Sequence, residues 1–234
     1  IVLNTIVAEA FRDACDVLEG AENFEDAVHD LIKKNLSEHQ RIIFNGNGYS
    51  DEWVEEAAKR GLPNIKCMVD AVDYLATPEN IEMFEKHGVM SKRELVARGV
   101  VMYENYAKQI NIEAKTMIDI AGKQIIPAVI KYTTELATSA AAVKSVCDAD
   151  ISVQTELLAE VSDLLSETKV ALAKLEEVTE KGGTMEEGRD QAVYYRDVVK
   201  TTMDALRAPV DKLEMLVDKD IWPCLLYTSP SPRD

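Results

Sequence analysis

Apolar side chains recur at helical spacing along almost the whole chain, and this periodicity constrains the fold more than any other feature. Residues 3–19 carry an i, i+3, i+4 stripe, and the residues after Ser91 keep helical spacing for about seven turns. Glycine and proline, at 10 and 7 of 234 residues, are too sparse for a sandwich or barrel of many short strands. We therefore predict a mainly α-helical fold.

The first two predicted helices, over residues 3–19 and 23–36, both have an apolar face, and we expect the face of the second to point inward. The apolar residues of the first are Leu3, Ile6, Val7, Ala10, Phe11, Ala14 and Leu18; those of the second are Phe24, Ala27, Val28, Leu31 and Ile32. Asn23, Ser50 and Thr77 are predicted helix caps. Ser91 and Glu94 form a capping box that begins the first long helix.

Three long helices are predicted in the second half of the chain. Pro127 should kink or break the first, because its ring clashes with the carbonyl group of Lys123. We expect Gly182-Gly183 to form a turn, with a second capping box starting at Thr184. The last helix has a 4-3-4-3-4 apolar seam at Val199, Met203, Leu206, Val210, Leu213 and Val217. These helices should stack antiparallel as a bundle.

Charge and composition exclude several classes of protein. The chain has 26 basic and 42 acidic residues and a formal charge of -16, a surface that repels nucleic-acid phosphates. No apolar run approaches the roughly 20 residues that cross a bilayer. The four cysteines and three histidines are scattered, which predicts buried thiols in a cytosolic protein and no zinc site. We expect neither a nucleic-acid nor a membrane partner.

The segment Asn45-Gly46-Asn47-Gly48-Tyr49-Ser50 is the only stretch whose pattern suggests a site. Its two Asn-Gly pairs predict a turn, since both residue types tolerate positive φ. A glycine-rich turn before a helix can cradle a phosphate, but the segment lacks the P-loop lysine and does not match GxGxxG. A plain structural turn is the favoured interpretation.

Acidic residues follow this turn at Asp51, Glu52, Glu55 and Glu56. They are suited to a hard cation in principle, although such a cluster is more often a solvated helix face. The chain contains no Ser/His/Asp, Cys/His or HExxH arrangement. The pattern therefore identifies no catalytic residue and no metal ligand.

Several longer stretches resemble type III glutamine synthetase. They occur in order at residues 3–10, 41–53, 60–64, 84–89, 111–114, 124–132 and 220–223. The most distinctive is Phe44-Asn45-Gly46-Asn47-Gly48-Tyr49-Ser50-Asp51-Glu52-Trp53. The resemblance implies the C-terminal end of a glutamine synthetase catalytic domain at 1–90, followed by a long-helix domain at 91–223.

The resemblance also implies what the parent enzyme does. Such ligases join ammonia to glutamate in the cytoplasm, using ATP and Mg²⁺ or Mn²⁺, and they assemble as homo-oligomers of stacked rings. The strands that carry the metal ligands and most nucleotide contacts are expected upstream of this chain. We therefore expect no catalytic residue, no bound cofactor and no activity for this chain alone. The candidates in its distinctive loop are Asn45, Asn47, Tyr49 and Asp51, for contact with substrate or for loop shape and subunit contact.

Two further expectations concern the ends of the chain and its class. The last residues, 224–234, resemble translated adapter sequence, and we expect a non-native tail there; a native Ser/Pro linker is the alternative. Residues 133–180 are rich in Ala, Ser and Thr. They suggest a competing function as a non-enzymatic helical scaffold or coiled-coil interaction module.

Overall fold

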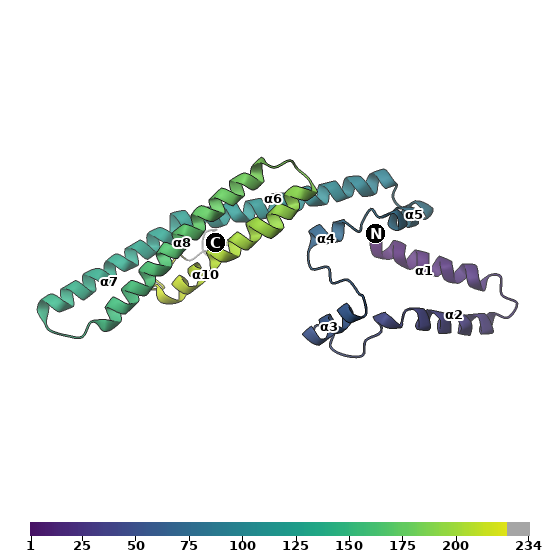
Figure 1. Cartoon of the computed structure of the whole chain (residues 1–234), viewed down its shortest axis with the longest axis horizontal. Coiled ribbons are helices and arrows are strands. Elements are labelled where there is room, and N and C mark those ends of the chain that lie inside the picture. The colour runs from purple at the N-terminus through teal and green to yellow at the C-terminus, as the bar shows by residue number, and fades with distance from the viewer. Residues whose placement is uncertain (224–234) are drawn as a thin grey trace, which may run out of the picture. The chain divides into compact units, whose positions relative to one another are not determined.

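The computed structural model describes residues 1–223, and these residues form helices and connecting turns without a strand (Figure 1). The α-helices are α1 (Val2–Leu18), α2 (Phe24–Glu38), α3 (Asp51–Lys59), α4 (Met68–Val72), α5 (Pro78–Lys86), α6 (Lys92–Ile120), α7 (Ile126–Val146), α8 (Ser152–Thr184), α9 (Arg189–Tyr194) and α10 (Lys200–Leu216). The predicted mainly α-helical fold is confirmed. The predicted non-native tail, 224–234, lies outside the described residues.

The predicted helix starts are formed by side-chain caps. Asn23, Ser50 and Thr77 each accept a hydrogen bond of 3.4 Å from the backbone N–H three residues further on. At the start of α6, the Ser91 N–H donates to Glu94 Oε2 at 2.8 Å, and the Glu94 N–H donates back to Ser91 Oγ at 3.4 Å. These bonds satisfy donors that a helix leaves unpaired at its first turn.

The chain divides into two compact units, and the boundary between Met102 and Tyr103 falls within α6. In the first unit α1 contacts α2 and α5, and a small core gathers around Phe84, Met90 and Leu95. Helix α2 has no fully buried residue. On its predicted inward face Ala27, Val28 and Leu31 are half-buried, whereas Phe24 and Ile32 are exposed, so the prediction is confirmed for only part of that face. The short helices of this unit are too few to enclose the faces of α1 and α2.

A polar clasp joins α1 to the end of α5. The Glu9 carboxylate lies 2.6 Å from Lys86 Nζ through Oε1 and 2.6 Å from His87 Nε2 through Oε2. Hydrogen bonding from Lys86, and then from His87, lowers the pKa of Glu9, and the hydrogen bond to Glu9 raises the pKa of Lys86. The contact between the two helices therefore includes an ionic component.

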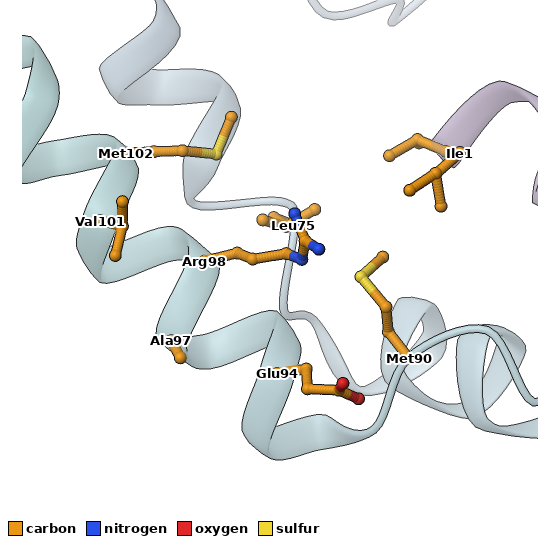
Figure 2. Close-up of a pocket in the computed structure, with 9 residues that line it drawn as sticks. Ile1, Leu75, Met90, Glu94, Ala97, Arg98, Val101 and Met102 are labelled. Carbon is orange, nitrogen blue, oxygen red and sulfur yellow. The ribbon is translucent and has the colours of Figure 1, made fainter.

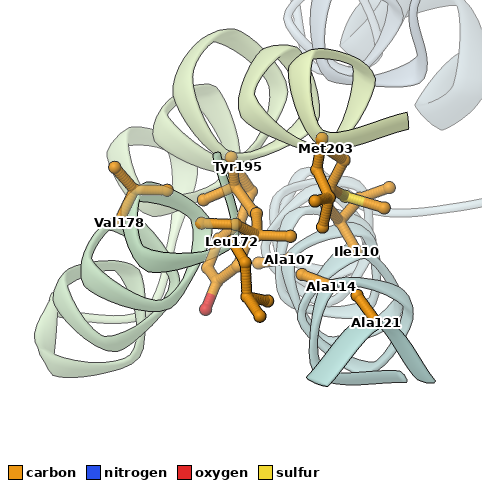
Figure 3. Packing of buried hydrophobic residues seen from close by; sticks show 11 residues of the cluster. Ala107, Ile110, Ala114, Ala121, Leu172, Val178, Tyr195 and Met203 are labelled. Atoms are coloured by element: carbon orange, nitrogen blue, oxygen red, sulfur yellow. The ribbon is translucent and has the colours of Figure 1, made fainter. Parts of the chain in front are cut away.

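The second unit is a bundle in which α8 packs against both α7 and α10. Figure 3 shows its buried side chains packed together; they include Ala107, Ile110, Ala114, Ala121, Leu172, Val178, Tyr195 and Met203. Of the six seam residues from Val199 to Val217, only Val210 is half-buried, and the others are buried. The predicted seam is confirmed.

The Gly182-Gly183 turn is a wrong prediction. Helix α8 continues through both glycines to Thr184, and α9 begins only at Arg189, after Gly188 with φ 139°. The physical reason is packing: a Cβ at Gly182 would lie 2.9 Å from Tyr195 Cζ. Gly182 therefore lies inside a helix at a position where a side chain would collide with the Tyr195 ring. The predicted capping box at Thr184 is consequently wrong as well.

Pro127 does not break the long helix. The chain passes from α6 through a π-helical turn, Ala121–Ile125, directly into α7. The Ile126 N–H donates to the carbonyl oxygen of Ala121, five residues earlier. Such a widened turn accommodates a residue that lacks an N–H and clashes with the carbonyl four residues before it. At Pro127 the helix therefore continues, and the turn before it is π-helical instead of α-helical.

Surface properties add two findings. Over residues 1–223, no helix combines the length and apolar character needed to span a membrane. Cys15 and Cys147 are exposed and Cys67 is half-buried. The prediction of buried thiols is wrong at these three positions, and Cys224 lies outside the described residues.

Candidate functional site

The distinctive loop lies between a short 3₁₀ turn, Gln40–Ile42, and helix α3. Its turn closes at Asn47, whose carbonyl oxygen accepts from the Ser50 N–H at 3.2 Å and from Ser50 Oγ at 2.9 Å. The Asn47 side-chain oxygen accepts from the Tyr49 N–H at 3.1 Å. The predicted turn is confirmed, but no residue of the loop has a positive φ. Positive φ therefore does not explain its two glycines.

Gly46 leaves room for an aromatic ring. A Cβ at this position would lie 2.6 Å from Phe44 Cζ and 2.8 Å from Phe44 Cε1. The Phe44 ring in turn stacks on Trp53 of α3, with 4.3 Å between ring centroids and 27° between planes. The absence of a side chain lets the loop fold over an aromatic pair.

Arg60 supports the same loop from the end of α3, a role that the sequence pattern did not reveal. Its Nη1 donates to the carbonyl oxygen of Ile43 at 2.8 Å and to that of Arg41 at 3.3 Å. Its Nε donates to Glu56 Oε1 at 2.6 Å. The guanidinium carbon also lies 5.7 Å from the centroid of the Trp53 ring. The i, i+4 spacing of Glu56 and Arg60 was the available signal.

The four candidate residues lie along this loop and the first turn of α3, and all four are exposed. Asn47 has an internal role, since it forms the turn. Tyr49 is fully exposed, at 102% of its reference area. Asp51 is the first residue of α3. The loop therefore presents an amide at Asn45, a phenol and a carboxylate to its surroundings.

The electrostatics of the loop do not suit a phosphate. Ser50 already accepts from the Trp53 N–H, and Asp51 and Glu52 occupy the first turn of α3. Carboxylates in the first turn of a helix already complement its dipole, and their charge repels a second anion there. The structure thus favours the structural-turn interpretation over a phosphate cradle.

The acidic residues after the loop do not assemble a cation site. Glu56 is paired with Arg60. Within residues 1–223, no three His, Cys, Asp or Glu side chains converge in a way that would hold a metal ion.

A separate pocket in the first unit has a different chemistry. Figure 2 shows its lining, which includes Ile1, Leu75, Met90, Glu94, Ala97, Arg98, Val101 and Met102 around a volume of about 470 Å³. The Glu94 carboxylate is engaged by Ser91, which leaves a mainly apolar surface. The pocket suits an apolar group, and none of the four loop candidates lines it.

Comparisons with known proteins agree on one family. Residues 27–144 match the family described as "Glutamine synthetase C-terminal domain". The chain is 38% identical to a glutamine synthetase of Butyrivibrio fibrisolvens over 84% of its own length and 28% of that relative. It is 27% identical to a glutamine synthetase of Bacteroides fragilis strain YCH46 and 29% identical to a type-3 glutamine synthetase of Dictyostelium discoideum, covering 97% of this chain and 32% of each relative. The chain spans about a third of the length of the curated relatives it matches.

Proposed function

The chain belongs to the glutamine synthetase C-terminal domain family, and from this premise we propose that it is the C-terminal portion of a type III glutamine synthetase subunit. The observation that carries the proposal is the family match over residues 27–144, which includes loop 44–50 and Arg60. In this assignment, residues 1–90 complete the catalytic region and residues 91–223 form a long-helix domain. The tail at 224–234 is not native to the enzyme.

The parent enzyme, in this proposal, is an ATP-dependent ligase of the cytoplasm that joins ammonia to glutamate. Its substrates are glutamate, ammonia and ATP, its metal is Mg²⁺ or Mn²⁺, and its subunits assemble as stacked rings. The 42 acidic residues against 26 basic ones support the absence of a nucleic-acid partner.

We assign no chemical step to the residues of this chain. Residues 1–223 bring together no acidic or histidine cluster suited to a metal ion, and Asp51 and Glu52 in the first turn of α3 repel a nucleotide phosphate. Phosphoryl transfer depends on positioned cations around the γ-phosphate. The metal-ligand and nucleotide-binding strands belong to the rest of the parent, and the isolated chain is inactive.

We assign loop 44–50, together with Asp51 after it, to contact with substrate or with a neighbouring subunit. Asn47 maintains the turn, whereas Asn45, Tyr49 and Asp51 are exposed and available to another surface. Two roles fit this arrangement: contact with substrate in the parent, or contact with a neighbouring subunit. The full exposure of Tyr49 favours subunit contact, because aromatic anchors are enriched at protein interfaces.

A domain replacement tests the proposal. The matching C-terminal region of the Butyrivibrio fibrisolvens enzyme is exchanged for this chain, and glutamine formation is measured beside the purified chain alone. We expect an active chimera and no glutamine from the chain. A chimera that assembles at the size of the relative's enzyme but makes no glutamine would overturn the proposal, and glutamine from the chain alone would overturn its predicted inactivity.

The scaffold alternative predicts a different result in the same experiment. A non-enzymatic coiled-coil module would self-associate without restoring activity to the relative. Light scattering of the purified chain measures this association. Self-association together with an inactive chimera would favour the scaffold.

A further inference from the structure

We propose that Arg60 is a positioning residue that fixes the shape of loop 44–50 and so determines how the loop presents Asn45, Tyr49 and Asp51. The inference builds on the proposed contact role of the loop, but its structural part stands on the contacts of Arg60 alone. No substrate contact is assigned to Arg60 itself.

Arg60 joins the two ends of the loop. The chain enters the loop through Arg41 and Ile43, and both carbonyl oxygens accept from Arg60 Nη1. The chain leaves the loop into α3, where Glu56 accepts from Arg60 Nε. One guanidinium therefore links backbone before the loop to a side chain after it, across 17 to 19 residues.

The same guanidinium group covers an aromatic stack. The guanidinium carbon lies 5.7 Å from the Trp53 ring centroid, and Phe44 stacks on Trp53 at 4.3 Å. Phe44 then leaves no room for a side chain at Gly46. The order of contacts runs from Arg60 through both rings to the first glycine of the loop.

Lysine cannot replace arginine in this arrangement. The planar guanidinium donates to a carboxylate through Nε and to two carbonyl groups through Nη1, and it also lies over the Trp53 ring. An ammonium is a compact point charge without that fork. Arg60→Lys keeps the charge and the attraction to Glu56 but loses the geometry, which makes it a sharper test than removal of the charge.

The consequence is a loop that is formed before it meets its partner. Tyr49 is fully exposed, yet its N–H donates to the Asn47 side chain, and the Ser50 hydroxyl next to it donates to the Asn47 carbonyl oxygen. A preformed loop avoids the entropy cost of ordering on contact. Loss of Arg60 should leave the same exposed groups in a loop that opens more often.

The test compares Arg60→Lys with Arg41→Lys in the full chain. Arg41 provides a matched control, because its backbone carbonyl is used and the structure gives its side chain no hydrogen bond or ion pair among residues 1–223. Hydrogen exchange of the loop amides and chymotryptic cleavage after Tyr49 are measured. We expect both to accelerate by about tenfold or more in Arg60→Lys, since hydrogen bonds to a charged group hold the closed state by that much. Arg41→Lys should match the wild type.

A spectroscopic measurement separates loop positioning from general destabilisation. In a Trp222→Phe background, Trp53 is the remaining tryptophan, and its near-ultraviolet circular dichroism reports the stack with Phe44. Arg60→Lys should lose this signal while helical content stays unchanged. Glu56→Gln provides a second variant, with a smaller change of the same kind. If Arg60→Lys and Arg41→Lys give the same exchange rates, the positioning role is wrong.

The function of the loop is tested by the same variant in the chimera described above. If the loop opens and glutamine formation or ring assembly falls, both inferences are supported. If the loop opens while activity and assembly are unchanged, the proposed contact role of the loop is wrong and the positioning role of Arg60 remains. The two failures are thereby distinguished.

Discussion

Apolar stripes of similar spacing are buried in the second unit of the chain and exposed on α1 of the first unit. In the second unit, Leu172 and Leu206 are each 1% exposed within a closed set of helices, whereas in the first unit Leu3 is 76% and Phe11 68% exposed. Both sets follow helical spacing. The difference teaches that periodicity defines an apolar face but that only a neighbouring element buries it. The face of α1 and α2 is therefore the part of this chain most in need of a partner surface.

The same contrast appears in how helices are joined. In the second unit, α8 and α10 meet through buried aliphatic and aromatic side chains. In the first unit, α1 meets α5 through a carboxylate between a lysine and a histidine. Exposed ion pairs contribute little to stability, whereas buried aliphatic side chains contribute substantially. We expect the first unit to open locally more easily than the second.

The largest expected effect comes from one substitution placed in each unit. Leu172→Ala should lower the free energy of unfolding by about 2–5 kcal/mol, because it leaves a cavity in the core. Leu3→Ala should change it by less than about 0.5 kcal/mol, because the side chain is already exposed. Both residues are helical, so helix propensity is matched. Urea unfolding followed by circular dichroism measures both values, and equal losses would mean that the stripe of α1 is buried in solution.

The next effect uses two adjacent glycines of α8. Gly182→Ala should destabilise the bundle by about 1–3 kcal/mol, since the new Cβ overpacks against Tyr195. Gly183→Ala should stabilise it by up to about 1 kcal/mol, because nothing lies within 4 Å of its Cβ and alanine favours a helix. Thermal unfolding measures the sign. Two changes of the same sign would contradict the close approach of Tyr195.

The smallest effect concerns the polar clasp. The pKa of Glu9 lies below its ordinary value of 4.5, so its stabilising contribution is present above about pH 4.5 and is lost as pH falls through the lowered pKa. The pKa of Lys86 lies above 10.5, so that contribution is present below about pH 10.5 and is lost as pH rises through the raised pKa.

Glu9→Gln should remove both dependences. Hydrogen exchange of α1 amides at acid, neutral and alkaline pH measures this, with Glu22→Gln as a control of equal charge change. We expect faster exchange at neutral pH in Glu9→Gln alone. Identical behaviour of the two variants at every pH would show that the clasp does not hold α1.

The turn of the candidate loop was predictable from the sequence, but the contacts that hold the loop were not. The unusual run of Asn and Gly residues located the loop, and Ser50 located the start of α3. The hydrogen bonds of Arg60 to the loop were not predicted, because Arg60 donates to carbonyl groups 17 and 19 residues earlier. A backbone carbonyl acceptor has no residue type, so no sequence pattern reveals it.

The sequence by itself determined the features that depend on neighbours within one or two turns. These include the helical class of the fold, the caps at Asn23, Ser50, Thr77 and Ser91, and the apolar seam from Val199 to Val217. The tertiary structure alone decided that Gly182 lies inside a helix against a ring, that Gly46 makes room for Phe44, and that Phe24 and Ile32 of α2 stay exposed. Caps and seams arise from short-range geometry, whereas burial and close approach depend on which distant segment packs against a residue.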